Sequence, residues 1–395
     1  MRILLYTYDW MPLVGGVQTI TMSLTKGLAE WPKTHPEEPV SVTLVTETPA
    51  GAMDDSLFPF RVVRQPSIGN LIRLVRAADV IHIAGPAILP MILALTFRKP
   101  TVVEHHGYQS ICPNGELFYW PDHSVCPGHF MAGHYGKCVG CNSGAIGWRK
   151  SFLNLVLTFP RRWLARAVCA NVVPSCHIRS RISLPRTQLI YHGIPKPERP
   201  IRASVNEYES QPPCFAYVGR LIIEKGLPVL LHASRQLADA GYSFRLKIIG
   251  DGPERHNLEK LTEQLGLSSR TQFVGSVPVE DVAETLLGSS VVVMPSLWED
   301  VAPLVAIEQM AQGRLVIASD IGGLGEEVDG VGLKFPPGDA VALASCMRQV
   351  IEHPYVALEM GQRAGKRAAE SFTEHRMMEE HLRLYQKLEQ IHRGY

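Results

Sequence analysis

The stretch PSLWEDVAPLVAIEQM (residues 295–310) carries three carboxylates in an otherwise apolar run: Glu299, Asp300 and Glu308. Ionised carboxylates are costly to bury without partners, so their presence here needs an explanation. The apolar residues just before the stretch predict a buried strand. Because Pro303 suits a first helical turn and Gly313 suits an exit, we expect a helix over residues 303–312. The stretch thus predicts a turn from a buried parallel strand into a helix.

The same alternation of apolar strand, loop and helix runs through most of the chain, and it indicates an α/β protein. Strands are predicted at residues 2–7, 40–46, 79–85, 100–106, 214–219, 244–250, 271–275, 291–295 and 314–319. Helices are predicted at residues 67–77, 87–97, 227–240, 254–265, 278–287 and 303–312. The alternation lapses over residues 108–145, where we expect a loop rich in Cys, His, Gly and Pro.

Length and composition predict two globular domains. At 395 residues the chain exceeds what one hydrophobic core usually supports, and its 46% apolar content is typical of a folded protein. The Pro-rich residues 198–213 are the expected linker between an N-terminal domain (1–197) and a C-terminal domain (214–375). A charged helix over residues 376–395 is expected to pack back on the first domain. Two such domains would leave a cleft, which is a common ligand site.

Charge is unevenly distributed, although the net charge is only +1. Residues 1–197 carry 19 Lys/Arg and 11 Asp/Glu (net +8), and the rest carry 20 and 27 (net −7). No Asp or Glu occurs over residues 123–197, which favours an anionic partner for this half. No segment has the pattern of a transmembrane helix or a signal peptide. We therefore expect a cytoplasmic protein, either free or peripheral at the inner face of the membrane, with its cysteines mostly reduced and no nucleic-acid partner.

Two basic residues follow the first strand of the C-terminal domain, in the segment VGRLIIEKG (218–226). Because ligands bind at the carboxyl ends of parallel strands, Arg220 and Lys225 would clamp a pyrophosphate there. The N-terminus of the helix at 303–312 favours a phosphate, and Glu308 inside that helix would reach a sugar hydroxyl. The alternative is that these carboxylates only cap the helix or form a solvated stripe.

The ordered motifs resemble the retaining glycosyltransferases of family 4, which have the GT-B fold of two Rossmann-like domains facing a central cleft. The resemblance covers nearly the whole chain. The motifs occur in family order at residues 219–226, 250–253, 273–275, 295–299, 300–308 and 322–326. An ordered set of this kind is far more specific than any single motif.

The resemblance implies a donor site for a nucleotide-diphosphate sugar, with no cofactor required for catalysis. Arg220 and Lys225 would hold the diphosphate, and Glu308 the ribose. Asp300 would contact the transferred sugar, although the family usually has Glu at this position. The implied catalytic residues are His106, Arg220, Lys225 and Asp300. The implied binding residues are Gly15, Gly16, Arg220, Lys225, Glu299, Asp300, Pro303, Leu304, Val305 and Glu308.

Two motifs of the N-terminal domain complete the resemblance. MPLVGGVQ (11–18) matches the family's Gly-rich first loop, where Gly15 and Gly16 would let the backbone approach a substrate; a plain turn is the alternative. In VVEHHGYQSICP (102–113) the register selects His106 as the family's His near the transferred sugar, and the adjacent His105 stays an alternative. No D-x-D triplet occurs, which favours metal-independent chemistry, with cations and a helix N-terminus stabilising the leaving diphosphate.

The insert near residues 108–145 carries four cysteines: Cys112, Cys126, Cys138 and Cys141. The last two have the C-x₂-C spacing of a metal site. A structural zinc is the leading interpretation, and a disulfide or free thiols are the alternatives.

Residues 147–168 combine five Lys/Arg and two Trp with many apolar residues and no acid. A basic amphipathic helix of this kind lies on anionic membranes, which would fit a lipid-linked or membrane-borne acceptor. A core helix with solvated arginines is the alternative.

We therefore expect a retaining glycosyltransferase of glycan, lipopolysaccharide or glycolipid assembly. Two alternatives stay open: a sugar-nucleotide epimerase on the same fold, and a non-catalytic sugar-nucleotide-binding protein. The presence of Asp300 in place of Glu keeps the second alternative open. Turnover with an acceptor distinguishes the transferase from both, and conversion of the donor alone would indicate the epimerase.

Overall fold

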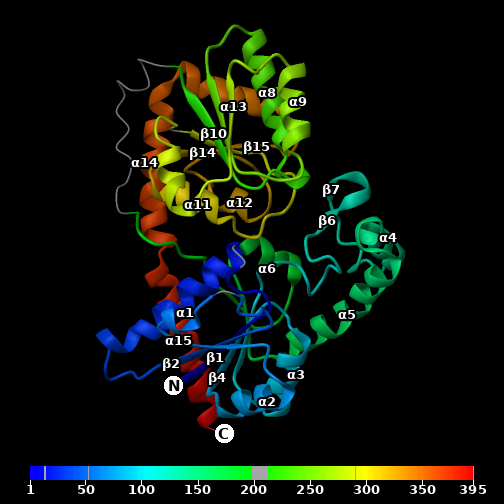
Figure 1. Cartoon of the computed structure of the whole chain (residues 1–395), viewed down its shortest axis with the longest axis vertical. Helices are drawn as coiled ribbons and strands as arrows, with labels where there is room; N and C mark the ends of the chain where they lie inside the picture. The colour runs from blue at the N-terminus through cyan, green and yellow to red at the C-terminus, as the bar shows by residue number, and fades with distance from the viewer. Residues whose placement is uncertain (13–14, 52, 198–211, 290, 395) are drawn as a thin grey trace. The chain divides into compact units, whose positions relative to one another are not determined.

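The computed structural model describes residues 1–12, 15–51, 53–197, 212–289 and 291–394. Within these residues the chain forms two compact units, each a sheet covered by helices (Figure 1). Unit 1 comprises Met1–Trp120, Cys126–Pro195 and Phe372–Tyr395, and unit 2 comprises Pro121–Val125 and Lys196–Ser371. The predicted linker at 198–213 lies almost wholly outside the described residues.

Unit 1 is built on a seven-stranded parallel sheet with the order β3-β2-β1-β4-β5-β8-β9. The strands are β1 (Arg2–Thr7), β2 (Ser41–Thr46), β3 (Arg61–Arg64), β4 (Val80–Ala84), β5 (Thr101–Glu104), β8 (Ala170–Val173) and β9 (Thr187–Leu189). The helices are α1 (Gly16–Thr34), α2 (Ile68–Ala77), α3 (Ile88–Thr96), α4 (Tyr135–Ile146), α5 (Trp148–Ala167), α6 (Cys176–Ile182) and α15 (Glu374–Arg393). Strand order reverses between β1 and β4, where ligands bind in doubly wound sheets.

The last helix of the chain, α15, packs inside unit 1. It contacts α1 and β4, and Met378 on α15 lies 3.1 Å from where a Cβ on Gly27 would sit. Ser23 on α1 donates a hydrogen bond to Glu374 at 2.5 Å, and the Tyr385 hydroxyl lies 2.7 Å from Nδ1 of His82. Residues from both ends of the sequence therefore share one core.

Unit 2 has a six-stranded parallel sheet with the order β12-β11-β10-β13-β14-β15. The strands are β10 (Cys214–Val218), β11 (Arg245–Ile249), β12 (Thr271–Gly275), β13 (Val291–Met294), β14 (Leu315–Ser319) and β15 (Leu333–Phe335). The helices are α8 (Leu227–Asp239), α9 (Arg255–Gln264), α10 (Val282–Thr285), α11 (Leu304–Ala311), α12 (Gly322–Glu327), α13 (Ala340–Glu352) and α14 (Pro354–Ser371). The strand order reverses between β10 and β13.

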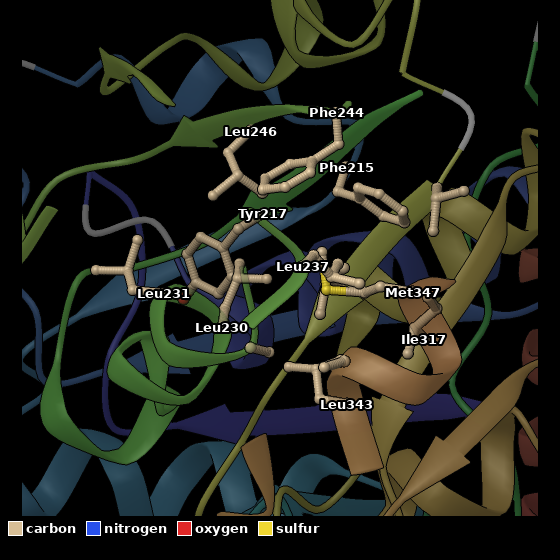
Figure 2. Packing of buried hydrophobic residues seen from close by; sticks show 14 of the residues in the cluster. Phe215, Tyr217, Leu230, Leu231, Leu237, Phe244, Leu246, Ile317, Leu343 and Met347 are labelled. Carbon is tan, nitrogen blue, oxygen red and sulfur yellow. The ribbon is translucent and has the colours of Figure 1, made fainter. Parts of the chain in front are cut away.

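The core of unit 2 lies between its sheet and the helices α8 and α13 (Figure 2). Phe215 and Tyr217 of β10 alternate with residues of the other face, and both pack against leucines of α8. The residues of β13 and β14 are buried on both faces, which explains why the sequence predicts these two strands from continuous apolar runs.

The sequence interpretation was wrong about the insert at residues 108–145. It is not a plain loop, because α4 lies in it together with the short strands β6 (Phe118–Tyr119) and β7 (Ser124–Val125). Three glycines within α4 hid the helical pattern. The helix is stabilised by packing, because its own residues have low helix propensity. It contacts α5, and its Cys138 clusters with Leu155 of α5 and with Phe130, which precedes α4.

The core assignment predicts the effect of truncating Leu231, which is 0% exposed on α8. Leu231→Ala should lower the free energy of unfolding of unit 2 by about 2–5 kcal/mol, because it removes packed methyl groups and leaves a cavity. Leu287→Ala is the control, since Leu287 is 62% exposed, and it should cost less than about 0.5 kcal/mol. Urea denaturation measures both, and equal losses would contradict this core.

Candidate functional site

The loops after β10 and β13 meet at the carboxyl edge of the unit 2 sheet, on either side of the strand-order switch. The backbone N–H of Leu297 donates to the carbonyl of Glu224 at 2.8 Å. Gly226 ends the first loop with φ +66°, and a Cβ on it would lie 2.0 Å from the carbonyl oxygen of Pro295. The two loops therefore touch through their backbones at a place where α/β sheets bind ligands.

This contact brings two of the predicted site residues together. The ammonium of Lys225 lies 2.5 Å from a carboxylate oxygen of Asp300 and 5.5 Å from the centre of the Trp298 ring. The Lys225 and Asp300 side chains are 18% and 11% exposed, so water screens the pair only partly. Arg220, on the same loop as Lys225, is exposed. The site thus offers one paired cation and one exposed cation.

The helix α11 begins beside this pair. It starts at Leu304, and Pro303 before it supplies no side-chain cap to the first N–H groups. Burial raises the pKa of Glu308, which lies in the second turn of α11. Glu299, on the loop that precedes the helix, is also buried. The sequence predicted a turn that leads into a helix after Asp300, and the structure has both. The helix and the turn before it carry Pro303, Leu304, Val305 and Glu308.

A third loop, after β14, packs against the second. The N–H of Gly323 donates to the carbonyl of Asp300 at 2.6 Å, and a Cβ on Gly323 would lie 2.0 Å from the carbonyl oxygen of Val301. Glu327 on α12 is buried, and burial together with the charge of Asp300 raises its pKa well above the usual range. The sequence motif indicated Glu326, which is only half-buried. Glu327 was missed because adjacent glutamates give no sign of which one faces inward.

In unit 1 the two adjacent histidines have different surroundings. His105 is fully buried, its Nε2 lies 2.9 Å from Asn171, and burial lowers its pKa to about 4. His106 lies 3.6 Å from the Glu104 carboxylate, and its ring stacks on that of His192 with centres 5.4 Å apart. His105 is therefore part of the core, and His106 belongs to a polar cluster that includes His192, which the sequence reasoning missed.

The Gly-rich loop is described only from Gly15 onward, because residues 13 and 14 lie outside the described part of the chain. Gly15 precedes α1 in an extended conformation (φ −173°), which any residue adopts. A Cβ there would lie 2.8 Å from the end of the flexible Gln18 side chain. Gly16 is the first residue of α1. Backbone strain therefore does not require glycine at position 15.

The four cysteines of the insert are all free thiols within the described residues. Cys138 and Cys141 lie on one face of α4, and Asn114 contacts the sulfurs of both Cys112 and Cys141. Burial and the neighbouring thiols raise the pKa of Cys138 to about 12. Among the described residues, the groups whose donor atoms lie within 4.8 Å of one another consist of histidines and Glu104, and include no cysteine. The structural zinc of the insert therefore stays a prediction.

The predicted basic helix is α5, which has one buried face and a second face with exposed apolar side chains. Ser151, Leu155, Thr158, Leu164 and Ala165 are buried against the unit. A second stripe is exposed at spacings of three and four residues: Trp148, Phe152, Val156, Phe159 and Trp163. No helix within the described ranges is long and apolar enough to cross a membrane.

Solved structures with the same architecture define the fold class. Sucrose-phosphate synthase from Thermosynechococcus elongatus matches with a TM-score of 0.70 at 21% identity, over 98% of both chains. HepE from Anabaena, in complex with UDP, matches with a TM-score of 0.71 at 18% identity, over 98% of this chain and 100% of that one. The chain therefore has the GT-B fold, as the motifs predicted.

Sequence comparison shows which glycosyltransferases the chain is similar to. Residues 199–371 match the family described as Glycosyl transferases group 1. The 2-deoxystreptamine glucosyltransferase of Streptomyces kanamyceticus is 34% identical over 144 residues, which are 36% of this chain and 37% of that protein. A glycogen synthase of Mycobacterium tuberculosis is 28% identical over 57% of this chain and 56% of its own length. The matched segments thus span 37% and 56% of these relatives, and family 4 within the group stays a prediction.

The backbone contact at Gly226 predicts a specific loss of stability. Gly226→Ala should destabilise unit 2 by about 3 kcal/mol or more, because the new Cβ meets the strain of positive φ and also a carbonyl oxygen. Gly330→Ala is the matched control, with φ +73° and nothing within 4 Å of its Cβ, so it should cost only about 1–2 kcal/mol. Urea denaturation of the two variants tests this, and similar losses would contradict the loop contact.

Proposed function

We propose that the chain is a retaining glycosyltransferase that transfers a sugar from a nucleotide-diphosphate sugar to a glycan or lipid-linked acceptor, without a catalytic metal. The observation that carries the proposal is the Lys225–Asp300 pair at the strand-order switch, with Arg220 exposed on the same loop. The group 1 match over this segment supports a sugar-transferring enzyme. The UDP bound by the similar Anabaena protein supports a nucleoside diphosphate as the leaving group.

In this mechanism the diphosphate replaces Asp300 as the partner of Lys225. Arg220, Lys225 and the N–H groups of Leu304 and Val305 then stabilise the charge that develops on the departing diphosphate. Asp300, released from its ion pair, accepts hydrogen bonds from hydroxyls of the transferred sugar.

The remaining site residues position the donor. Glu308 has a raised pKa, so its carboxyl group binds the ribose hydroxyls either as donor or as acceptor. Glu299 and His106 are proposed to contact the transferred sugar. The acceptor oxygen bonds to the anomeric carbon on the face from which the diphosphate leaves, and the hydroxyl proton goes to the departing diphosphate, so no covalent enzyme intermediate is required.

The donor site predicts which variants lose nucleotide affinity. One of UDP, GDP, ADP, CDP and dTDP should raise the unfolding temperature, because a ligand at 100 times its Kd adds about 2.7 kcal/mol. Arg220→Ala and Lys225→Ala should weaken that nucleotide about 10- to 100-fold by calorimetry, through loss of a charge-assisted hydrogen bond. Lys366→Ala, on an exposed lysine of α14, is the control.

Two outcomes would contradict the donor site: none of the five nucleotides binds, or Arg220→Ala binds as tightly as the parent protein. If a nucleotide binds, incubation of the corresponding nucleotide sugar with and without acceptors distinguishes transfer from epimerisation. Binding without any turnover would favour the non-catalytic alternative.

We propose further that α5 lies on an anionic membrane, where it meets a lipid-linked acceptor. The exposed stripe of Trp148, Phe152, Val156, Phe159 and Trp163 is long enough to bury an apolar face in the lipid interface. The helix carries five Lys/Arg and no acid, so the charge around the stripe complements anionic lipid headgroups. Leu89 and Ile92 on α3, a helix that contacts α5, are also exposed apolar residues.

The membrane proposal predicts co-sedimentation with vesicles of phosphatidylglycerol and phosphatidylcholine at low salt. Trp148→Ala/Trp163→Ala should reduce the bound fraction at least several-fold without loss of stability, because both side chains are more than 60% exposed. Tyr355→Ala, on an exposed aromatic of α14, should bind like the parent protein. Equal binding of all three proteins, or no binding to anionic vesicles, would contradict the proposal.

A further inference from the structure

Unit 1 contains a buried cluster that the proposed reaction does not use as a whole. Its centre is Glu104, the last residue of β5, whose side chain is 2% exposed. Histidines from four separate segments surround it: His82 on β4, His106 after β5, His192 after β9, and His381 on α15. Burial alone would raise the pKa of Glu104, but the histidines outweigh it and hold the pKa well below its usual range.

The spacing of the donor atoms is unusual for a hydrogen-bonded cluster. From the Glu104 carboxylate, Nε2 of His82 lies at 3.0 Å, but Nε2 of His106 and of His381 lie at 3.6 and 3.7 Å. The two longer distances exceed those of hydrogen bonds. A tetrahedral ion with ligands about 2.0–2.1 Å away holds its ligands roughly 3.3 Å apart. The donor atoms of His82, Glu104 and His381 all lie within 4.8 Å of one another, which suits ligands of one ion.

The hydrogen bonds of His381 decide what its Nε2 can do. Its Nδ1 lies 2.8 Å from the carbonyl oxygen of Met377, and a carbonyl only accepts, so Nδ1 carries the hydrogen. In the neutral ring Nε2 then bears a lone pair, and this buried atom has no hydrogen-bond partner in the described chain. A lone pair 3.7 Å from a buried carboxylate oxygen is repelled unless a cation lies between them.

The ring nitrogens of His82 and His381 that face away from Glu104 have polar partners, as they do in histidines that bind metals. His381 donates from Nδ1 to Met377, and Nδ1 of His82 lies 2.7 Å from the hydroxyl of Tyr385 on the same helix. Such contacts fix the ring orientation and the tautomer of a ligand. Because the phenol hydroxyl both donates and accepts, it also fits the tautomer of His82 that leaves Nε2 open to an ion.

We propose that His82, Glu104 and His381 bind a divalent transition-metal ion of the Zn²⁺ class. Imidazole nitrogen with carboxylate oxygen is a ligand set that Zn²⁺ and its neighbours take. The ion joins α15 to β4 and β5, so its role is structural, and it is independent of the proposed sugar transfer. Because the ion needs the lone pairs of both imidazoles and an ionised carboxylate, the affinity falls when the pH is low enough to protonate these ligands.

The experiment uses the full chain, with any purification tag removed, in a Cys138→Ser/Cys141→Ser background that excludes zinc held by the insert. The protein is stripped with a chelator and titrated with Zn²⁺ against a chromophoric competitor, and its unfolding temperature is recorded with and without Zn²⁺. One equivalent should bind and raise the unfolding temperature. His381→Gln should weaken binding at least about 100-fold and abolish the rise. His375→Gln, whose side chain on α15 is 70% exposed, should bind like its background.

Failure to bind an equivalent of Zn²⁺, or equal affinity in the His381→Gln variant, would overturn the proposal and leave a proton as the cation of the cluster. X-ray absorption of the zinc-loaded background protein needs no substitution within the cluster. A shell of nitrogen and oxygen with imidazole scattering supports the proposal, and a shell without imidazole overturns it. Neither result depends on nucleotide binding or turnover, so the outcome is separate from that of the proposed function.

Discussion

The candidate site of unit 2 depends on one steric constraint, the contact of loop backbones with no room for a side chain between them. At Gly226 and at Gly323 an added Cβ would lie 2.0 Å from a carbonyl oxygen of the neighbouring loop. Lys225 and Asp300 lie far apart in the sequence. They form an ion pair because the loops after β10, β13 and β14 meet this closely. The sheet sets where the loops begin, and the glycines set how near they approach.

The site also gathers several carboxyl groups, and their surroundings differ. Glu299, Asp300, Glu308 and Glu327 are all buried or half-buried, and the charge of Asp300 disfavours ionisation of Glu327. Asp300 pairs with Lys225, whereas burial raises the pKa of Glu308, and burial together with the charge of Asp300 raises the pKa of Glu327. A raised pKa makes protonation of a carboxyl group easier, and a neutral carboxyl group donates a hydrogen bond and does not repel an anionic diphosphate.

The sequence alone predicted the elements that local pattern determines. Continuous apolar runs marked most strands of both sheets, although β3, β8, β9 and β15 were not predicted, and Pro303 with Gly313 marked α11 to within one residue at each end. It missed α4, whose glycines weaken the helical signal and whose stability comes from packing on α5. It also missed Glu327 and the cluster around Glu104, because a single sequence does not show which residues a fold brings together. The Lys225–Asp300 pair was predicted in part: the sequence identified both residues as site residues, but it did not indicate that they contact each other.

Glu104 shows why contacts between distant residues cannot be predicted from local sequence patterns. A buried carboxylate is tolerated only when several partners surround it, and here two of them, His82 and His381, lie near opposite ends of the chain. Until α15 packs on β4, Glu104 lacks His381 and His82 lacks the hydroxyl of Tyr385. The core of unit 1 is therefore complete only after the chain has passed through unit 2 and returned. Such long-range closure carries an entropic cost that the buried polar contacts help to offset.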